Sequence, residues 1–227
     1  ISPLLIRSTE PFLVGLLFIV IMMTAANFSK GHINPIFSMG EYFVKLFTQI
    51  KNKKFILADL WEFLMYFVSQ FLGGLLAFGV VWRLRNQLID FQIVLNNLGS
   101  TEGIKDTFLS QLKFGTTFSP DFATVALCIE AVFVFGLVLV FLFNSNSPLR
   151  KSFTPFMVGL ALFAFTVMAN DLTGSSFNPI RSLVPALFLQ GDAMRQVWLY
   201  LLAPLLGSLA ASAVYYGMTL LGTVKKQ

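Results

Sequence analysis

Two short stretches of the chain pair asparagine with proline in a way that suits the start of a helix: Gly31-His32-Ile33-Asn34-Pro35-Ile36 and Ser176-Phe177-Asn178-Pro179-Ile180-Arg181. Asparagine caps the first turn of a helix, and proline is tolerated next because its missing N–H would have no helical partner. The N-terminus of a helix carries about half a positive charge. Two such starts brought together would repel cations, while the amides of Asn34 and Asn178 would donate hydrogen bonds to water or a small polar solute.

Four residues, two of them within these stretches, carry polar chemistry in apolar surroundings. Arg181 follows Asn178 by three residues, and a charge at membrane depth faces a cavity or a partner. Glu130 interrupts a long apolar run, and we expect it to support a motif loop from a buried position. We expect the same bracing role for His32 beside the first motif and Asp171 before the second.

No pattern in the sequence indicates catalysis or a bound cofactor. His32 is the only histidine, and no cysteine, second histidine or carboxylate accompanies it at the spacing of metal ligands. No nucleophile–base pair, phosphate-binding loop or cofactor fingerprint is recognisable. We therefore expect no metal and no cofactor, and we do not expect an enzyme.

The composition is that of a membrane protein. Of the 227 residues, 56% are hydrophobic and only 12% are charged, and the mean hydropathy is +0.76. A soluble domain usually has about 25% charged residues. The net charge of +5 is spread over loops, so nucleic acid is not an expected partner.

Apolar runs of membrane-spanning length set out the elements that must position the two motifs. A spanning helix needs about 20 residues, and residues 11–28, 55–82, 121–143, 153–170 and 196–221 approach or exceed this length. Residues 35–48 and 179–190 are too short and predict half-helices, which membrane depth tolerates only where they are buried in protein or line a cavity. Residues 1–10, 83–120 and 191–195 are predicted to be connections, with a short interfacial helix at 86–98.

The basic residues predict the sidedness of these elements. Because each predicted span crosses the membrane, successive connections lie on alternate faces of it. One face then carries most of the basic residues and is expected to be cytoplasmic, or the matrix side of a mitochondrial membrane. These residues are Lys45, Lys51, Lys53, Lys54, Arg150, Lys151, Lys225 and Lys226. The two motif loops then enter from opposite sides, as in an inverted repeat. We expect one domain over 1–227, with half-repeats 1–82 and 121–227 joined by a connecting loop at 83–120. The first half is one span short, and the repeat predicts that this span lies before residue 1.

These motifs and their topology resemble the aquaporin, or major intrinsic protein, family. The family motif Ser-Gly-Ala-His-Leu-Asn-Pro-Ala corresponds to residues 29–36, and Thr-Gly-x-x-x-Asn-Pro-Ala-Arg-Ser corresponds to residues 173–182. Glu130 falls where the family has a buried glutamate. The resemblance implies an all-α bundle with five transmembrane helices and two re-entrant half-helices, the first helix of the family being absent. It also implies a passive channel for water or small uncharged solutes.

The resemblance further implies a selectivity ring made of Val14, Thr166, Ser175 and Arg181. Strict water channels of the family have an aromatic residue and a histidine at the first two positions. The smaller Val14 and Thr166 favour a wider ring that passes a small polyol, urea or peroxide. Glycerol channels usually follow the arginine with aspartate, whereas Ser182 follows it here, so the choice between water and larger solutes stays open.

Three departures from the family pattern support a second interpretation. Ile36 and Ile180 replace the usual alanines, and Lys30 replaces a small residue close to the first motif. Together with the absent helix, these changes suit a non-conducting structural subunit of a larger membrane complex. The expected partners are therefore the lipid bilayer and either a homo-tetramer or such a complex. The protein is expected to be an integral, multi-pass protein of the plasma membrane or the mitochondrial inner membrane.

Overall fold

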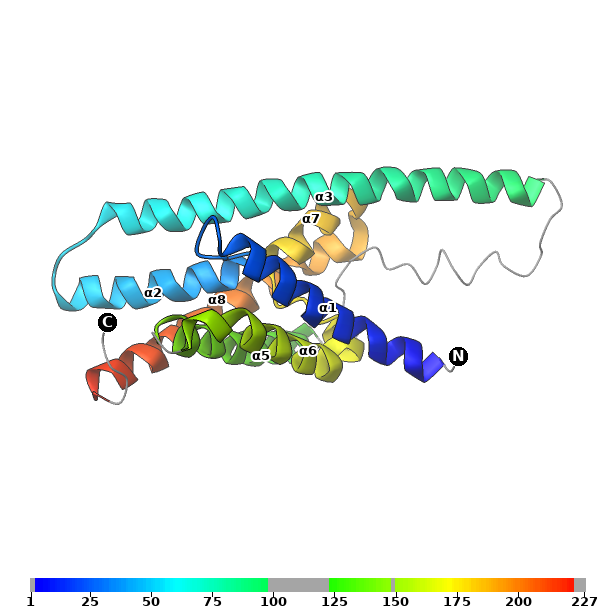
Figure 1. The fold of residues 1–227 in the computed structure, drawn as a ribbon. Coiled ribbons are helices and arrows are strands. Elements are labelled where there is room, and N and C mark those ends of the chain that lie inside the picture. The colour runs from blue at the N-terminus through cyan, green and yellow to red at the C-terminus, as the bar shows by residue number, and fades with distance from the viewer. Residues whose placement is uncertain (1–2, 98–122, 148–149, 223–227) are drawn as a thin grey trace.

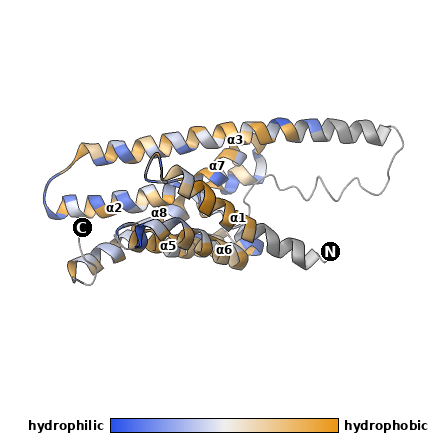
Figure 2. Ribbon diagram, in the orientation of Figure 1, coloured by the Kyte–Doolittle hydropathy of each residue, from blue (hydrophilic) through white to orange (hydrophobic). Residues whose placement is uncertain are grey.

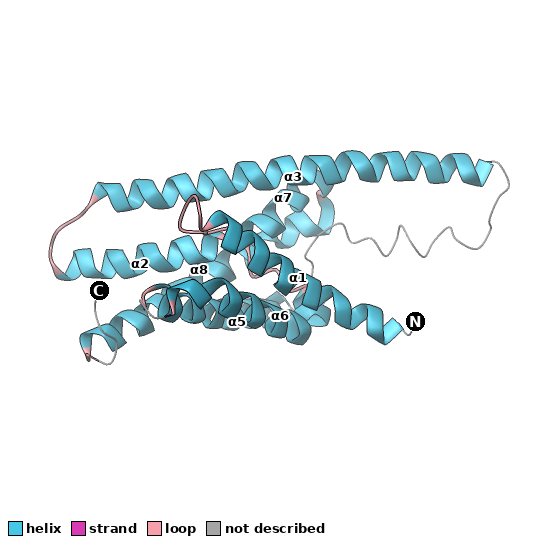
Figure 3. Ribbon diagram, in the orientation of Figure 1, coloured by secondary structure: helices cyan, strands magenta, loops and turns pink. Residues whose placement is uncertain are grey.

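All regular secondary structure in the residues that the structure describes is helical (Figure 3). The computed structural model describes residues 3–97, 123–147 and 150–222. The elements in chain order are α1 (Pro3–Ala25), α2 (Pro35–Lys51), α3 (Leu57–Asn97), α5 (Ala123–Ser145), the short 3₁₀ helix η1 (Lys151–Phe153), α6 (Thr154–Thr173), α7 (Pro179–Leu189) and α8 (Gly191–Leu220).

The helices form one bundle in which α2 and α7 lie between longer helices (Figure 1). Helix α5 packs against α6 and α8, and α1 packs against α6. Helix α3 runs along one side of the bundle, next to α2 and α7. The main core gathers around Val134, Leu137 and Val138 of α5, which are almost fully buried together with Ile36 and Phe177 of the motif stretches. The core therefore surrounds the two motifs.

Four helices in the described part of the chain are long and apolar enough to cross a membrane: Leu57–Leu84, Ala123–Ser145, Lys151–Thr173 and Gly191–Leu220. Figure 2 shows apolar residues dominating α5, α6 and the part of α1 that carries colour. Helix α1 has 23 residues, a length of about 35 Å at 1.5 Å per residue. Its apolar stretch, Pro11–Ala25, is shorter than those of the four other helices. The chain is an integral membrane protein that crosses the bilayer several times.

Three predicted connections are wrong because helices continue through them. Residues 3–10 belong to α1, and residues 83–97 extend α3 to 41 residues. The predicted interfacial helix at 86–98 is therefore mostly the end of α3, and the predicted loop at 191–195 is the first turn of α8. Residues 83–97 and 192–196 contain neither glycine nor proline, so no local signal stops a helix there. The remainder of the predicted connection, 98–120, lies outside the described residues.

Small residues allow two pairs of helices to cross closely. A Cβ added to Gly207 of α8 would lie 2.5 Å from the carbonyl oxygen of Ala131 on α5. A Cβ on Gly15 of α1 would lie 2.7 Å from the carbonyl oxygen of Gly159 on α6. In a bilayer, packing replaces the hydrophobic effect as the force between helices, and small residues allow the backbones to approach.

The variant Gly207→Ala is expected to lower the stability of the bundle by about 1–3 kcal/mol, because the added methyl group forces α5 and α8 apart. Thermal unfolding of the purified protein in detergent measures the loss. Gly217→Ala on the same helix is the matched control, since a Cβ there meets nothing within 4 Å. Equal melting temperatures for the two variants would contradict the close crossing.

Candidate functional site

The two Asn-Pro stretches start helices that meet inside the bundle. The side-chain oxygen of Asn34 accepts a hydrogen bond from the N–H of Ile36 at 3.2 Å, and that of Asn178 accepts from the N–H of Ile180 at 2.9 Å. Each asparagine therefore caps the helix that its proline begins. The Asn34 amide also donates to the carbonyl oxygen of Phe177 at 2.9 Å. This contact joins the two motif stretches directly.

Glu130 holds the second motif loop from α5. Its carboxylate accepts hydrogen bonds from the hydroxyl of Thr173 at 2.6 Å and from the backbone N–H groups of Ser176 and Phe177 at 2.9 and 2.8 Å. Ser175 and Phe177 have the left-handed φ values 46° and 47°, each of which costs about 1–3 kcal/mol in a non-glycine residue. The fully buried carboxylate offsets this strain by pairing the N–H groups that the turned backbone directs inward.

The first motif loop is held differently. The backbone N–H of Lys30 donates to the hydroxyl of Tyr66 at 2.9 Å, and the amide of Gln70 donates to the carbonyl oxygen of His32. The ring of His32 is buried, and its Nδ1 atom lies 3.2 Å from the hydroxyl oxygen of Ser38. The N–H groups of His32 and Ile33, which correspond to those that Glu130 binds in the second loop, have no acceptor among the described residues.

Every residue predicted for the selectivity ring borders a single cavity. Val14 comes from α1, Thr166 from α6, Ser175 from the second motif loop and Arg181 from α7, and they enclose about 170 Å³ together with Asn34 and Asn178. The guanidinium of Arg181 donates to the carbonyl oxygens of Ser175 at 2.6 Å and Gly174 at 3.0 Å. These bonds fix its position beside the loop.

Pro11, at the predicted start of the first span, also borders this cavity, as do three residues of α1 and α6 that the sequence did not single out, Phe18, Leu162 and Asn170. Phe18 follows Val14 by four residues on α1, and Leu162 and Asn170 flank Thr166 by four residues on α6. Residues four apart share a face of a helix, so this spacing was a usable signal for all three.

The isoleucines of the two motifs pack away from the cavity. Ile36 is fully buried in the core around α5, and Ile180 is 6% exposed beside Phe78 and Val184. A Cβ on Gly74 of α3 would lie only 2.8 Å from the Cγ2 atom of Ile180, so the glycine makes room for the larger side chain. Neither isoleucine is among the residues that border the cavity.

Asp171 is the one predicted loop-bracing residue for which the structure gives no contact with the loop. It lies exposed in the last turn of α6, and no hydrogen bond joins it to the described residues of the second motif. Thr173, two residues further on, makes the contact with Glu130 instead.

The model of the major intrinsic protein family matches residues 10–215, which covers both motifs. The chain belongs to the major intrinsic protein family. The resemblance seen in the motifs is thereby confirmed.

Relatives of two kinds appear among the similar members of this family. A glycerol uptake facilitator protein-like 6 of Lactiplantibacillus plantarum is 28% identical over 216 residues, covering 93% of this chain and 87% of that protein. Aquaporin Z of Photorhabdus laumondii is 25% identical over 202 residues, covering 88% and 78% of the two chains. The fold is similar to that of the aquaglyceroporin from Plasmodium falciparum, with a TM-score of 0.69, 22% identity and coverage of 96% of this chain and 86% of that one.

Removing the carboxylate in Glu130→Ala is expected to destabilise the protein by about 2–6 kcal/mol, because two buried N–H groups lose their acceptor at about 1–3 kcal/mol each. Thermal unfolding in detergent measures this effect. Val132→Ala, at a residue of α5 that is 63% exposed, controls for changes to the same helix. A Glu130→Ala variant as stable as Val132→Ala would contradict the bracing role.

Proposed function

We propose that this chain is a passive channel for water and small uncharged solutes, and that it catalyses no reaction. The observation that carries the proposal is that Val14, Thr166, Ser175 and Arg181 border one cavity together with both motif asparagines. The family membership and the relatives named as an aquaporin and a glycerol uptake facilitator support the same function.

The proposed path passes the starts of α2 and α7. Each helix start contributes about half a positive charge, and the Arg181 guanidinium adds a full one, so a cation meets a repulsive field. The side-chain NH₂ group of Asn178 donates no hydrogen bond among the described residues and is free to donate to a solute oxygen. A solute that receives hydrogen bonds here keeps a fixed orientation, which is the basis for excluding protons.

The width of the ring supports solutes larger than water. Val14 and Thr166 are small, and no ring or imidazole occupies their positions. Ser182, where glycerol channels of the family have aspartate, bonds the hydroxyl of Ser176 and does not border the cavity. We therefore propose that the ring residues rather than Ser182 decide whether glycerol, urea or peroxide passes.

We also propose that a further transmembrane helix completes the wall beside α3. The internal repeat pairs Tyr66 with Tyr200, since each hydroxyl bonds the backbone of a motif loop, and the same register pairs Gly73 with Gly207. Gly207 packs directly against the backbone of α5, whereas a Cβ on Gly73 would meet nothing within 4 Å. The N–H groups of His32 and Ile33 and the buried Oε1 atom of Gln70 have no partner in the described part of the chain.

The source of that helix separates the two functional interpretations. A helix of the same protein would complete a channel. The family commonly forms tetramers, and we propose a tetramer in the bilayer for this chain. A helix from a partner protein would favour the alternative, a structural subunit of a larger membrane complex.

Stopped-flow light scattering of proteoliposomes tests the proposal with water, glycerol and urea. Vesicles containing the wild-type protein are expected to shrink in sucrose and to re-swell with at least one solute, faster than empty vesicles. Rates equal to those of empty vesicles for water and for both solutes would contradict a channel.

The variant Arg181→Val is expected to keep solute flux and to admit protons or cations, because it removes the fixed positive charge of the ring. A pH-sensitive dye trapped in the vesicles measures the proton leak under a potassium-valinomycin potential. Arg195→Val is the matched control, since Arg195 is an exposed arginine on α8 that pairs with Asp192. Equal proton exclusion by the folded Arg181→Val variant and the control would count against the ring assignment.

A further inference from the structure

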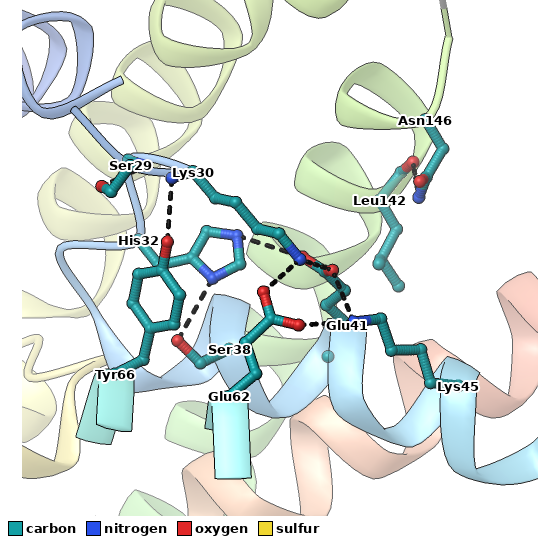
Figure 4. Close-up of polar contacts among 12 residues, drawn as sticks. Ser29, Lys30, His32, Ser38, Glu41, Lys45, Glu62, Tyr66, Leu142 and Asn146 are labelled. Atoms are coloured by element: carbon teal, nitrogen blue, oxygen red, sulfur yellow. Dashed lines mark hydrogen bonds and ion pairs between the residues drawn. The ribbon is translucent and has the colours of Figure 1, made fainter. Parts of the chain in front are cut away.

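Lys30 is a charged residue inside the first motif loop, and its ammonium group is paired with two carboxylates although its side chain is 41% exposed. Its Nζ atom forms ion pairs with the carboxylates of Glu41 on α2 and Glu62 on α3 (Figure 4). Its backbone N–H donates to the hydroxyl of Tyr66, also on α3. One residue therefore connects the loop to both neighbouring helices.

The two carboxylates belong to a larger network. Lys45 of α2 lies 2.7 Å from Glu62, 3.1 Å from Asp59 and 3.3 Å from Glu41. Nε2 of His32 lies 3.4 Å from the second oxygen of Glu41. The side chains around this network leave a space of only about 10 Å³, which is about the room of one water molecule. An isolated surface ion pair is worth little, whereas several charges that form a network contribute more to stability.

No such ion-pair network is present at the second motif loop among the residues that the structure describes. When the two halves are aligned at Asn34 and Asn178, Lys30 corresponds to Gly174 and Glu41 to Pro185. When they are aligned at Tyr66 and Tyr200, Glu62 corresponds to Gln196. The second loop is instead held by Glu130 through backbone N–H groups. The two halves therefore fix their loops with different charged groups, one on the loop itself and one on a neighbouring helix.

The position of the first loop matters to the cavity because Asn34 follows Lys30 by four residues. Asn34 borders the cavity and donates to Phe177 of the second loop. The carbonyl of His32, between Lys30 and Asn34, is held by Gln70 of α3. A loop that moves away from α3 would therefore move Asn34 and break its contact with the second loop.

We propose that Lys30 is a positioning residue of the transport path: its ion pairs with Glu41 and Glu62 hold the first motif loop so that Asn34 stays at the cavity. The inference rests on the proposed channel function. It assigns to Lys30 a role in holding the loop, because its ammonium group is paired with carboxylates of the same chain.

Two measurements test the proposal on Lys30→Met, Lys30→Arg and the matched control Lys54→Met. Lys54 is an exposed lysine on the α2–α3 connection for which no ion pair is present among the described residues. Lys30→Met is expected to increase deuterium uptake of the backbone over 26–34 and to reduce water flux per folded protein about fivefold, the effect of a bias of about 1 kcal/mol. Lys30→Arg keeps the charge and is expected to restore most of both values.

A second variant distinguishes loss of the contact between Lys30 and Glu62 from a general loss of protein stability. Glu62→Gln removes one partner of Lys30, and the double variant Lys30→Met/Glu62→Gln is expected to lose less flux than the two single losses combined, because both remove the same contact. Independent, multiplicative losses would overturn the proposal. Wild-type deuterium uptake in Lys30→Met, or wild-type flux in a variant whose loop has loosened, would also overturn it. Absence of water flux in the wild-type protein would refute the channel function instead. Deuterium uptake over 26–34 would still test whether the ion pairs of Lys30 hold the first motif loop.

Discussion

A polar backbone that is not helical must find hydrogen-bond partners at membrane depth, and the rest of this structure depends on that constraint. Both motif loops leave the helical pattern, and every unsatisfied N–H or C=O group in such surroundings costs several kcal/mol. Glu130 meets the requirement for the second loop by accepting two backbone N–H groups and one hydroxyl. Because Glu130 is fixed by the packing of α5 against α6 and α8, the close crossing at Gly207 is part of the same arrangement.

The first half of the chain meets the same requirement with different residues. Tyr66 and Gln70 of α3 bind the loop backbone, and Lys30 attaches the loop to carboxylates on two helices. The isoleucines at the two motifs are accommodated by the surroundings, with Gly74 clearing space for Ile180. Departures from the family pattern thus change how the loops are held and packed, while the two asparagines still border one cavity.

Local signals in the sequence predicted the features that depend on neighbouring residues. The helices that start at Pro35 and Pro179 follow from the capping chemistry of the preceding asparagines, and the helical membrane bundle follows from apolar length. The end of α3 and the start of α8 were mispredicted because polarity was used as a boundary in segments that contain no glycine or proline to stop a helix. The start of α1 was mispredicted because the helix continues through Pro11. The partners of Lys30 were out of reach, since Glu41 and Glu62 meet it only once α3 packs against α2. The structure pairs the Lys30 ammonium group with two carboxylates of the same chain.

The central claim is that solutes pass through the cavity bordered by Thr166, and a single engineered cysteine tests it most directly. Cys128 is the only native cysteine, so Cys128→Ser gives a background without thiols. In that background Thr166→Cys, at a position that is 7% exposed and borders the cavity, is compared with Val167→Cys, the next residue, which is 55% exposed. The account predicts that a mercurial reagent blocks most water flux through Thr166→Cys and leaves Val167→Cys unaffected. Unblocked flux through a labelled Thr166→Cys protein would contradict it.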